Sequence, residues 1–468
     1  MPGELNLQVT CLRDAVNANT PTPQMLYALL EAQPTGVQVA ATQMPLNLTL
    51  VLDRSGSMSG ARIQNLRQAV KMMIDQLQPT DVIAIVLFDD QVEITLPSQM
   101  ATNKPQLHAI ADAIDDRGGT QMSLGLQAGL QQAQRYLDPT RVNKIVLLTD
   151  GNTWGDEAQC LALAQQAGQY RIPIIALGLG LPQPIAAPGL PQPVGAAADD
   201  WNHTLLDNIA QASGGVSDLI ETPDKIVRVF QDIVRSAQAS VIRNAELIFR
   251  LSADVTAKQV WQVTPLISNL SQRAISPRDV QVTLGDIEKN IGKAVLVELT
   301  IPPRAPGKMR VAQAEVSYDV PAANLSGEKV RVDVIVEYGV ESAINPRVMN
   351  LVERVNAHKL QTRALQDASA GNIAGATQKL KQAATQLLNL GEAELAQQAL
   401  QEAQNLQQQG QMSAAGTKRL NYGTRKLTRP LNNPPTPPPA SRLSSPSVSR
   451  MSAFLRCSCR LSYLSALA

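Results

Sequence analysis

The chain has 468 residues, which is enough for two or three domains with a large core. Only 3% of the residues are aromatic, which disfavours a stacking surface for single-stranded nucleic acid and an aromatic sugar site. The formal net charge of +1 suggests no polyanion partner for the chain as a whole, but nine basic residues follow position 410 and leave 32 basic and 40 acidic residues before it. The sequence therefore predicts an acidic body with a basic tail.

The first 44 residues are too short for a domain, and they contain two strand-like pieces, LNLQVT and GVQVAA. We expect these pieces to join a β-sandwich formed mainly by residues 236–340. The segment 45–235 would then be inserted between the two parts of that sandwich.

Apolar strands and amphipathic helices alternate over residues 45–235. The predicted strands are 46–52, 82–88, 144–149 and 172–180, with a short VEIT piece after the second. The predicted helices are 60–77, about 103–115, 122–137, about 156–168, one from Trp201 and one near 224–236. This order predicts an α/β fold with a doubly wound, Rossmann-like, mostly parallel sheet covered by helices on both faces.

Residues 236–340 show short, valine-rich, alternating runs separated by turn residues, which is typical of an antiparallel β-sandwich. The runs are 245–252, 279–287, 293–302, 310–320 and 329–339.

Residues 343–428 are rich in alanine, leucine and glutamine and predict a helical segment. Breaks at Gly371-Asn372 and Gly391 allow either tetratricopeptide-type hairpins or a plain helical bundle, and we favour the bundle because only one repeat is legible. Residues 429–468 form a basic tail rich in proline and serine that we expect to be disordered.

The four cysteines, Cys11, Cys160, Cys457 and Cys459, match no zinc module and are too sparse for a disulfide scaffold. The first residues lack the pattern of a signal peptide, and no apolar run reaches membrane-spanning length. We therefore expect a cytoplasmic protein that has no membrane contact.

Polar residues follow the strands at one edge of the predicted sheet, where ligands of parallel α/β sheets bind. They are Asp53, Ser55 and Ser57 after the first strand, Thr120 after Gly118-Gly119, and Asp150 at the end of KIVLLT. Two carboxylates and three hydroxyls at one point would repel and desolvate one another without a cation. An all-oxygen donor set selects a hard cation such as Mg²⁺ or Mn²⁺. Gly56, Gly118 and Gly119 allow the tight turns that aim these short side chains.

Asp53-Arg54-Ser55-Gly56-Ser57 resembles the Asp-x-Ser-x-Ser signature of the von Willebrand factor type A domain. Thr120 and the Thr149-Asp150-Gly151 strand end complete a match to the metal-ion-dependent adhesion site of that domain, over about residues 45–235. The flanking β and helical segments look, more weakly, like bacterial and inter-α-trypsin-inhibitor-type relatives.

The resemblance implies a role for each position. Ser55 and Ser57 would bind the metal directly, and Asp53 directly or through water. Thr120 and Asp150 would exchange direct and water-mediated contacts, and one coordination position would accept a Glu or Asp carboxylate of a protein partner. Because neutral hydroxyls leave the ion under-neutralised, an incoming carboxylate is attracted.

Simpler interpretations exist for these and nearby residues. Asp53 and the serines after it could form a strand-to-helix turn in which a Ser or Asp caps the following helix and has no other role. Alternatively, the domain could keep the fold and bind no metal. Asp89-Asp90 could be a second metal site, although a solvated turn is favoured, and Asp115-Asp116-Arg117 reads as a charged loop. Cys160 reads as a buried apolar residue. The basic stretch KRLNYGTRKLTR, residues 418–429, could touch an acidic surface or nucleic acid, although a solvated tail is favoured.

The sequence thus favours a metal-dependent protein-interaction module that is not an enzyme. A metal-dependent hydrolase is disfavoured because Asp53 and Asp150 would be committed to the metal, and His108, His203 and His358 are scattered. A nucleic-acid-associated protein is the other alternative, and few aromatic residues and an acidic body disfavour it. The sequence has no phosphate-binding GxxxxGK[ST] loop.

Overall fold

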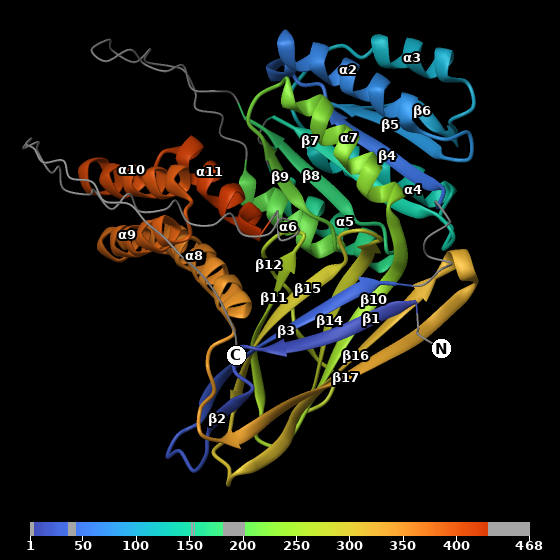
Figure 1. Ribbon diagram of the computed structural model, residues 1–468. Coiled ribbons are helices and arrows are strands. Elements are labelled where there is room, and N and C mark those ends of the chain that lie inside the picture. The colour runs from blue at the N-terminus through green and yellow to red at the C-terminus, as the bar shows by residue number, and fades with distance from the viewer. Residues whose placement is uncertain (1–3, 36–43, 151–152, 154, 181–201, 429–468) are drawn as a thin grey trace, which may run out of the picture. The chain divides into compact units, whose positions relative to one another are not determined.

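The computed structural model describes residues 4–35, 44–150, 153, 155–180 and 202–428 (Figure 1). The GVQVAA piece, Gly151 and the predicted tail 429–468 lie outside the described residues. Within these ranges, no helix has both the length and the apolar character that crossing a membrane requires.

A six-stranded sheet forms the centre of the α/β domain, with strand order β6-β5-β4-β7-β8-β9. Its strands are β4 (Leu46–Asp53), β5 (Val82–Phe88), β6 (Val92–Met100), β7 (Val142–Thr149), β8 (Ile174–Leu179) and β9 (Ser217–Ile220). All neighbours are parallel except the edge strand β6, which is antiparallel to β5. The predicted mostly parallel sheet is confirmed. Only β9 was missed, because its four residues SDLI carry no apolar run.

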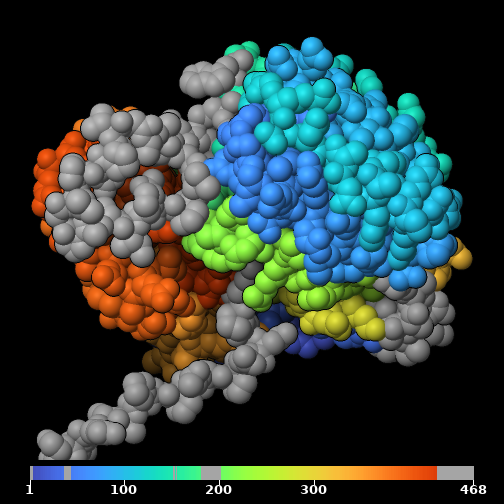
Figure 2. All heavy atoms as spheres, turned by 90° about the horizontal axis from the view of Figure 1, so that it is seen from above, coloured from blue at the N-terminus to red at the C-terminus, as the bar shows by residue number. Residues whose placement is uncertain are grey.

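Helices cover both faces of this sheet. The first face carries α2 (Ala61–Gln76), α3 (Lys104–Asp112) and α7 (Lys225–Gln238), and Figure 2 looks onto α2 and α3, coloured blue to cyan. The second face carries α4 (Met122–Arg135), α5 (Glu157–Gln169) and α6 (His203–Ser213). Successive residues of a strand point to opposite faces of the sheet, so Leu50 packs in the core on the first face and Val51 in the core on the second. Cys160 is fully buried in the second core, as expected.

Two further sheets enclose one apolar core and confirm the flanking sandwich. The first sheet is β1 (Leu5–Cys11), β3 (Gln24–Pro34), β15 (Lys293–Ile301), β11 (Thr256–Thr264) and β12 (Ser268–Asn269). The second is β13 (Arg273–Ala274), β14 (Asp279–Glu288), β10 (Ser240–Leu251), β16 (Gly307–Val320), β17 (Leu325–Gly339) and β2 (Ala15–Asn17). The pairs are antiparallel except β17 with β2. Strands of the first 44 residues therefore lie in both sheets.

Four helices follow the sandwich: α8 (Pro346–Ser369), α9 (Ile373–Asn389), α10 (Ala393–Gln409) and α11 (Ala414–Arg425). Each packs on the next, and α11 also contacts α8. This contact between the first and the last helix favours a compact bundle.

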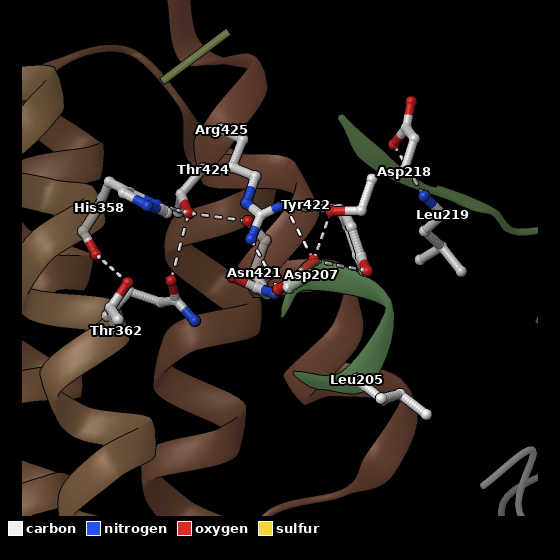
Figure 3. A network of polar contacts seen from close by, with 12 residues as sticks. Leu205, Asp207, Asp218, Leu219, His358, Thr362, Asn421, Tyr422, Thr424 and Arg425 are labelled. Carbon is white, nitrogen blue, oxygen red and sulfur yellow. Dashed lines mark hydrogen bonds and ion pairs between the residues drawn. The ribbon is translucent and has the colours of Figure 1, made fainter. Parts of the chain in front are cut away.

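The helix α11 docks on the α/β domain through a polar cluster around Asp207 of α6 (Figure 3). The guanidinium of Arg425 donates to both carboxylate oxygens of Asp207, at 3.1 and 2.7 Å. Asn421 Nδ2 and Tyr422 Oη donate to the same carboxylate at 3.0 and 3.1 Å. Lys426 pairs with Asp218 at 2.6 Å. The interpretation of residues 418–428 as a solvated tail is therefore wrong, since this stretch folds as α11 and binds an acidic surface of its own chain.

We expect Arg425→Gln to lower the free energy of unfolding by about 1–3 kcal/mol, because Asp207 keeps its partly buried charge and loses a two-point partner. Chemical denaturation of the full chain measures this change. The matched control is Arg235→Gln, which breaks an exposed pair with Asp232 and should change stability by less than about 0.5 kcal/mol. Equal effects of the two substitutions would contradict the proposed importance of the docking contact.

His358 of α8 lies beside this cluster, with Nδ1 2.8 Å from Thr424 Oγ1 (Figure 3). Its ring is nearly perpendicular to that of Trp261, at a centroid distance of 6.0 Å. Burial, and then the charge of Arg425, lower the pKa of His358 to about 3, while Asp207 acts in the opposite direction. The folded protein therefore keeps this imidazole neutral at pH values where the unfolded chain protonates it.

This depressed pKa predicts a loss of stability as the pH falls below about 6.5, the ordinary histidine value, towards 3. The unfolded chain binds one more proton in this window, so the slope from His358 approaches about 1.4 kcal/mol per pH unit. Denaturation at pH 7, 6 and 5 should show this slope in the difference between wild type and His358→Gln. A difference that does not vary with pH would disprove the buried neutral histidine.

Candidate functional site

Backbone hydrogen bonds connect three loops at the carboxyl edge of the sheet: the loop after β4, the loop after β5 and the loop between α3 and α4. The bonds run from Arg54 N to Phe88 O at 2.9 Å, Gly56 N to Gly118 O at 3.2 Å, Arg117 N to Arg54 O at 2.6 Å and Gln121 N to Asp89 O at 2.7 Å. The loop that carries Thr120 is thereby fixed against the loop that follows β4.

Asp53 ends β4 and is completely buried. Its Oδ2 accepts a hydrogen bond from Thr149 Oγ1 at 2.6 Å, and its Oδ1 accepts one from the Ser55 amide at 2.8 Å. Burial raises the pKa of Asp53, while the hydrogen bonds from Thr149 and Ser55 and the charge of Arg62 oppose that rise. Both carboxylate oxygens are therefore engaged by the protein, although each keeps a further lone pair.

A chain of hydrogen bonds links the two serines to Asp150. Ser55 Oγ lies 3.0 Å from Ser57 Oγ, and Ser57 Oγ donates to Asp150 Oδ1 at 2.7 Å. Ser57 is exposed, whereas Ser55 and Asp150 are buried. The structure thus brings Asp53, Ser55, Ser57 and Asp150 together in a set that runs from the interior to the surface.

Thr120 is half-buried in the neighbouring loop. Among the described residues, no hydrogen bond joins its side chain to the other four, so its place at the site rests on the backbone contact of Gly118. Gly118 has a φ of +76°, and a Cβ there would lie 2.7 Å from Asp90 Oδ1 and 2.8 Å from Asp89 Cβ. Gly119 has no positive φ, and a Cβ there would meet Asp90 Cβ at an ordinary 3.9 Å. Only the first glycine of the pair is therefore required by the turn.

The donor chemistry of this set fits a hard divalent cation. In the described parts of the chain, no group of three or more His, Cys, Asp or Glu side chains is arranged to hold a metal ion. Here two carboxylates are combined with hydroxyls, and neutral hydroxyl oxygens are suitable ligands for Mg²⁺ or Mn²⁺. Metal binding at Asp53, Ser55, Ser57, Thr120 and Asp150 remains a prediction.

Arg62 is a member of the site that the sequence analysis missed. It is the second residue of α2, and its guanidinium pairs with Asp150 Oδ2 and donates to the Ser57 carbonyl oxygen at 3.0 Å. One feature of the sequence could have indicated Arg62. A cation in the first turn of a helix is unfavourable unless an anion lies nearby, so an arginine at this position suggests an anionic partner.

The interpretation of Asp89-Asp90 as a solvated turn is wrong for Asp89. Asp89 is 2% exposed and pairs with Arg54 at 2.7 Å, while Asp90 is exposed. Burial acts to raise the pKa of Asp89, but the Gln91 amide and the Arg54 guanidinium lower it overall. Arg54 therefore anchors this loop from within the Asp-x-Ser-x-Ser sequence itself.

The start of α4 is also held at the site. Met122 N donates to Thr153 Oγ1 at 3.1 Å, and Ser123 N donates to Asp156 Oδ2 at 2.8 Å. Further along α4, a Cβ at Gly129 would lie 2.3 Å from Val51 Cγ2, so the helix approaches β4 at a distance that only glycine permits. These contacts fix the helix that directly follows Thr120.

A comparison with protein-family models assigns two segments. Residues 47–224 match the model of the von Willebrand factor type A domain, a range that includes the six-stranded sheet and its helices except α7. Residues 47–224 are a von Willebrand factor type A domain. Residues 346–430 match the Sll0103-like C-terminal α-helical domain, which coincides with α8 to α11.

Similar proteins include the uncharacterized protein sll0103 of Synechocystis, which is 28% identical over 73% of this chain and 78% of its own length. Human inter-α-trypsin inhibitor heavy chain H4 is 26% identical over 41% of this chain, which spans only 20% of that protein. Among solved structures, a von Willebrand factor type A protein from Catenulispora acidiphila has a TM-score of 0.70 at 15% identity and covers 90% of this chain and 96% of its own. That likeness supports the fold of all three parts.

We expect Gly118→Ala to lower the stability of this von Willebrand factor type A domain by about 1–3 kcal/mol, because a side chain at positive φ is strained and its Cβ meets Asp89 and Asp90. Thermal and chemical unfolding measure the loss. Gly119→Ala is the matched control and should stay within about 0.5 kcal/mol of wild type. Equal losses at the two positions would show that the positive φ is unimportant.

Proposed function

We propose that the von Willebrand factor type A domain is a metal-dependent protein-interaction module that binds an acidic residue of a partner protein. The observation that carries this proposal is the continuous set Asp53, Ser55, Ser57 and Asp150 at the carboxyl edge of the sheet, with Ser57 open to solvent. The similarity to inter-α-trypsin inhibitor heavy chains supports an interaction role.

Ser55 and Ser57 are the direct metal ligands in this proposal. Asp53, whose two oxygens accept hydrogen bonds from Thr149 and Ser55, would bind directly or through water. Thr120 and Asp150 would exchange direct and water-mediated contacts. The ion, Mg²⁺ or Mn²⁺, supplies a positive charge that two carboxylates and neutral hydroxyls screen incompletely, so it attracts a Glu or Asp side chain at the surface.

A binding role is favoured over catalysis because the two carboxylates of the site are already committed. Asp53 is held by Thr149 and Ser55, and Asp150 by Ser57 and Arg62, which leaves neither placed as a general base. Nucleic acid is also disfavoured as a partner. The exposed residues Asp90, Glu93, Asp115 and Asp116 lie around the site, and Arg425 and Lys426 of the basic stretch are bound to acidic residues of the same chain.

The test measures metal binding and partner binding on the same variants of the full chain. We expect wild type to bind Mn²⁺ in isothermal titration calorimetry and to retain lysate proteins in Mg²⁺ that EDTA releases. Ser57→Ala should weaken Mn²⁺ binding at least about tenfold, as is usual when a metal site loses a supporting group, and should abolish this retention. Ser59→Ala is the control, since Ser59 is an exposed serine two residues further on, outside the predicted ligand set.

Two results would contradict the proposal. If wild type binds no Mn²⁺, the site does not bind a metal and the proposal is wrong. Proteins retained equally in Mg²⁺, in EDTA and by Ser57→Ala would show that another surface binds the partner.

A further inference from the structure

Arg62 places a positive charge inside the site itself. Its side chain is 7% exposed, and the carboxylate that it pairs with, that of Asp150, is completely buried. The same Nη1 atom also donates to the Ser57 carbonyl oxygen, so the guanidinium touches two of the residues predicted to hold the metal. Its charge also acts on Asp53 at the end of β4.

These contacts compensate two unfavourable features of an arginine at position 62. A cation in the first turn of α2 is opposed by the helix dipole, and burial of a guanidinium is unfavourable unless anions compensate it. Asp150 and Asp53 provide that compensation. Arg62 therefore already neutralises the carboxylates that a divalent cation would neutralise.

We propose that Arg62 is the resident counter-ion of the site, and that a divalent cation competes with its guanidinium for Asp150. This inference rests on the proposed metal-dependent function and adds a competitor within the chain. Both oxygens of Asp150 are engaged, Oδ1 by Ser57 and Oδ2 by Arg62, so a cation that recruits Asp150 must share or replace one of these contacts. A cation beside Ser57 also meets the repulsion of a guanidinium that contacts the carbonyl oxygen of the same residue.

The competition predicts two opposite effects of Arg62→Gln. Without a metal the variant is less stable than wild type, because Asp150 keeps a buried charge and loses its cationic partner. With a metal the variant binds more tightly, because the ion no longer displaces a guanidinium. We expect its dissociation constant for Mn²⁺ to fall by about tenfold or more, the scale of one like-charge repulsion at a partly buried site.

The experiment compares full-length wild type, Arg62→Gln and Arg62→Lys by calorimetric titration with MnCl₂ and by thermal unfolding in EDTA and in Mn²⁺. Arg62→Gln should unfold several degrees below wild type in EDTA and gain more from Mn²⁺ than wild type does. Arg62→Lys keeps the charge, although not the guanidinium geometry, and should therefore bind Mn²⁺ more weakly than Arg62→Gln does. If Arg62→Gln folds only in the presence of Mn²⁺, the exchange of one cation for the other is demonstrated directly.

Lys71→Gln serves as the matched control. Lys71 lies on the same helix and pairs with Asp112 at 2.7 Å on the exposed surface, so its substitution removes one positive charge from α2 without touching the site. Its dissociation constant for Mn²⁺ should stay at the wild-type value. A tightening equal to that of Arg62→Gln would overturn the inference, because the effect would then come from general charge.

The remaining outcomes separate this inference from the proposed function. If wild type binds Mn²⁺ and Arg62→Gln binds it equally or more weakly, Arg62 is not a competitor, while the metal-binding function stands. If neither protein binds Mn²⁺, both the metal site and the competition are wrong. If only Arg62→Gln binds, the competition is established, and the guanidinium holds the wild-type site closed to the metal.

Discussion

Two buried carboxylates at the ends of neighbouring strands impose the main constraint on this site. Asp53 is the last residue of β4 and Asp150 follows β7, and both side chains are removed from water. An uncompensated buried charge destabilises a fold by several kcal/mol, so each carboxylate needs hydrogen bonds or a cation. The Thr149 hydroxyl and the Ser55 amide donate hydrogen bonds to Asp53. The Ser57 hydroxyl donates to Asp150, and the Arg62 guanidinium forms an ion pair with it.

The rest of the domain holds these partners in place. The apolar strand β4 is buried along its whole length, which fixes the depth of Asp53. The Arg54–Asp89 pair joins the loop after β4 to the loop after β5, and the close packing of α4 on Val51 fixes the start of the helix beside Thr120. Short side chains therefore suffice at the site, because the backbone around them has little freedom to move.

The sequence predicted the α/β domain well because its signals are local. Fully apolar strands, amphipathic helices and oxygen-bearing residues at strand ends are each visible within about ten residues. Arg62 was missed because its partner Asp150 lies 88 positions away, and an arginine in the first turn of a helix is only a weak signal of a nearby anion. The strand β3 was missed for a similar reason. Its YALLEAQ sequence suits a helix, but pairing with β1 and β15 buries Leu26 and Leu30 in the sandwich core.

The charge asymmetry of the chain was counted correctly, but the environment of its basic residues was predicted wrongly. The basic excess after residue 410 suggested a solvated tail, yet Arg425 and Lys426 pair with Asp207 and Asp218, and Arg419 lies 3.8 Å from Glu221. The acidic surface and the basic stretch are thus the two halves of one interface between the von Willebrand factor type A domain and α11. Arg62 and Asp150 form a similar pair within the site. The carboxylate that is predicted to bind a metal is already paired there with a cation of the same chain. For the described part of the basic stretch, the fold therefore supplies acidic partners from within the chain.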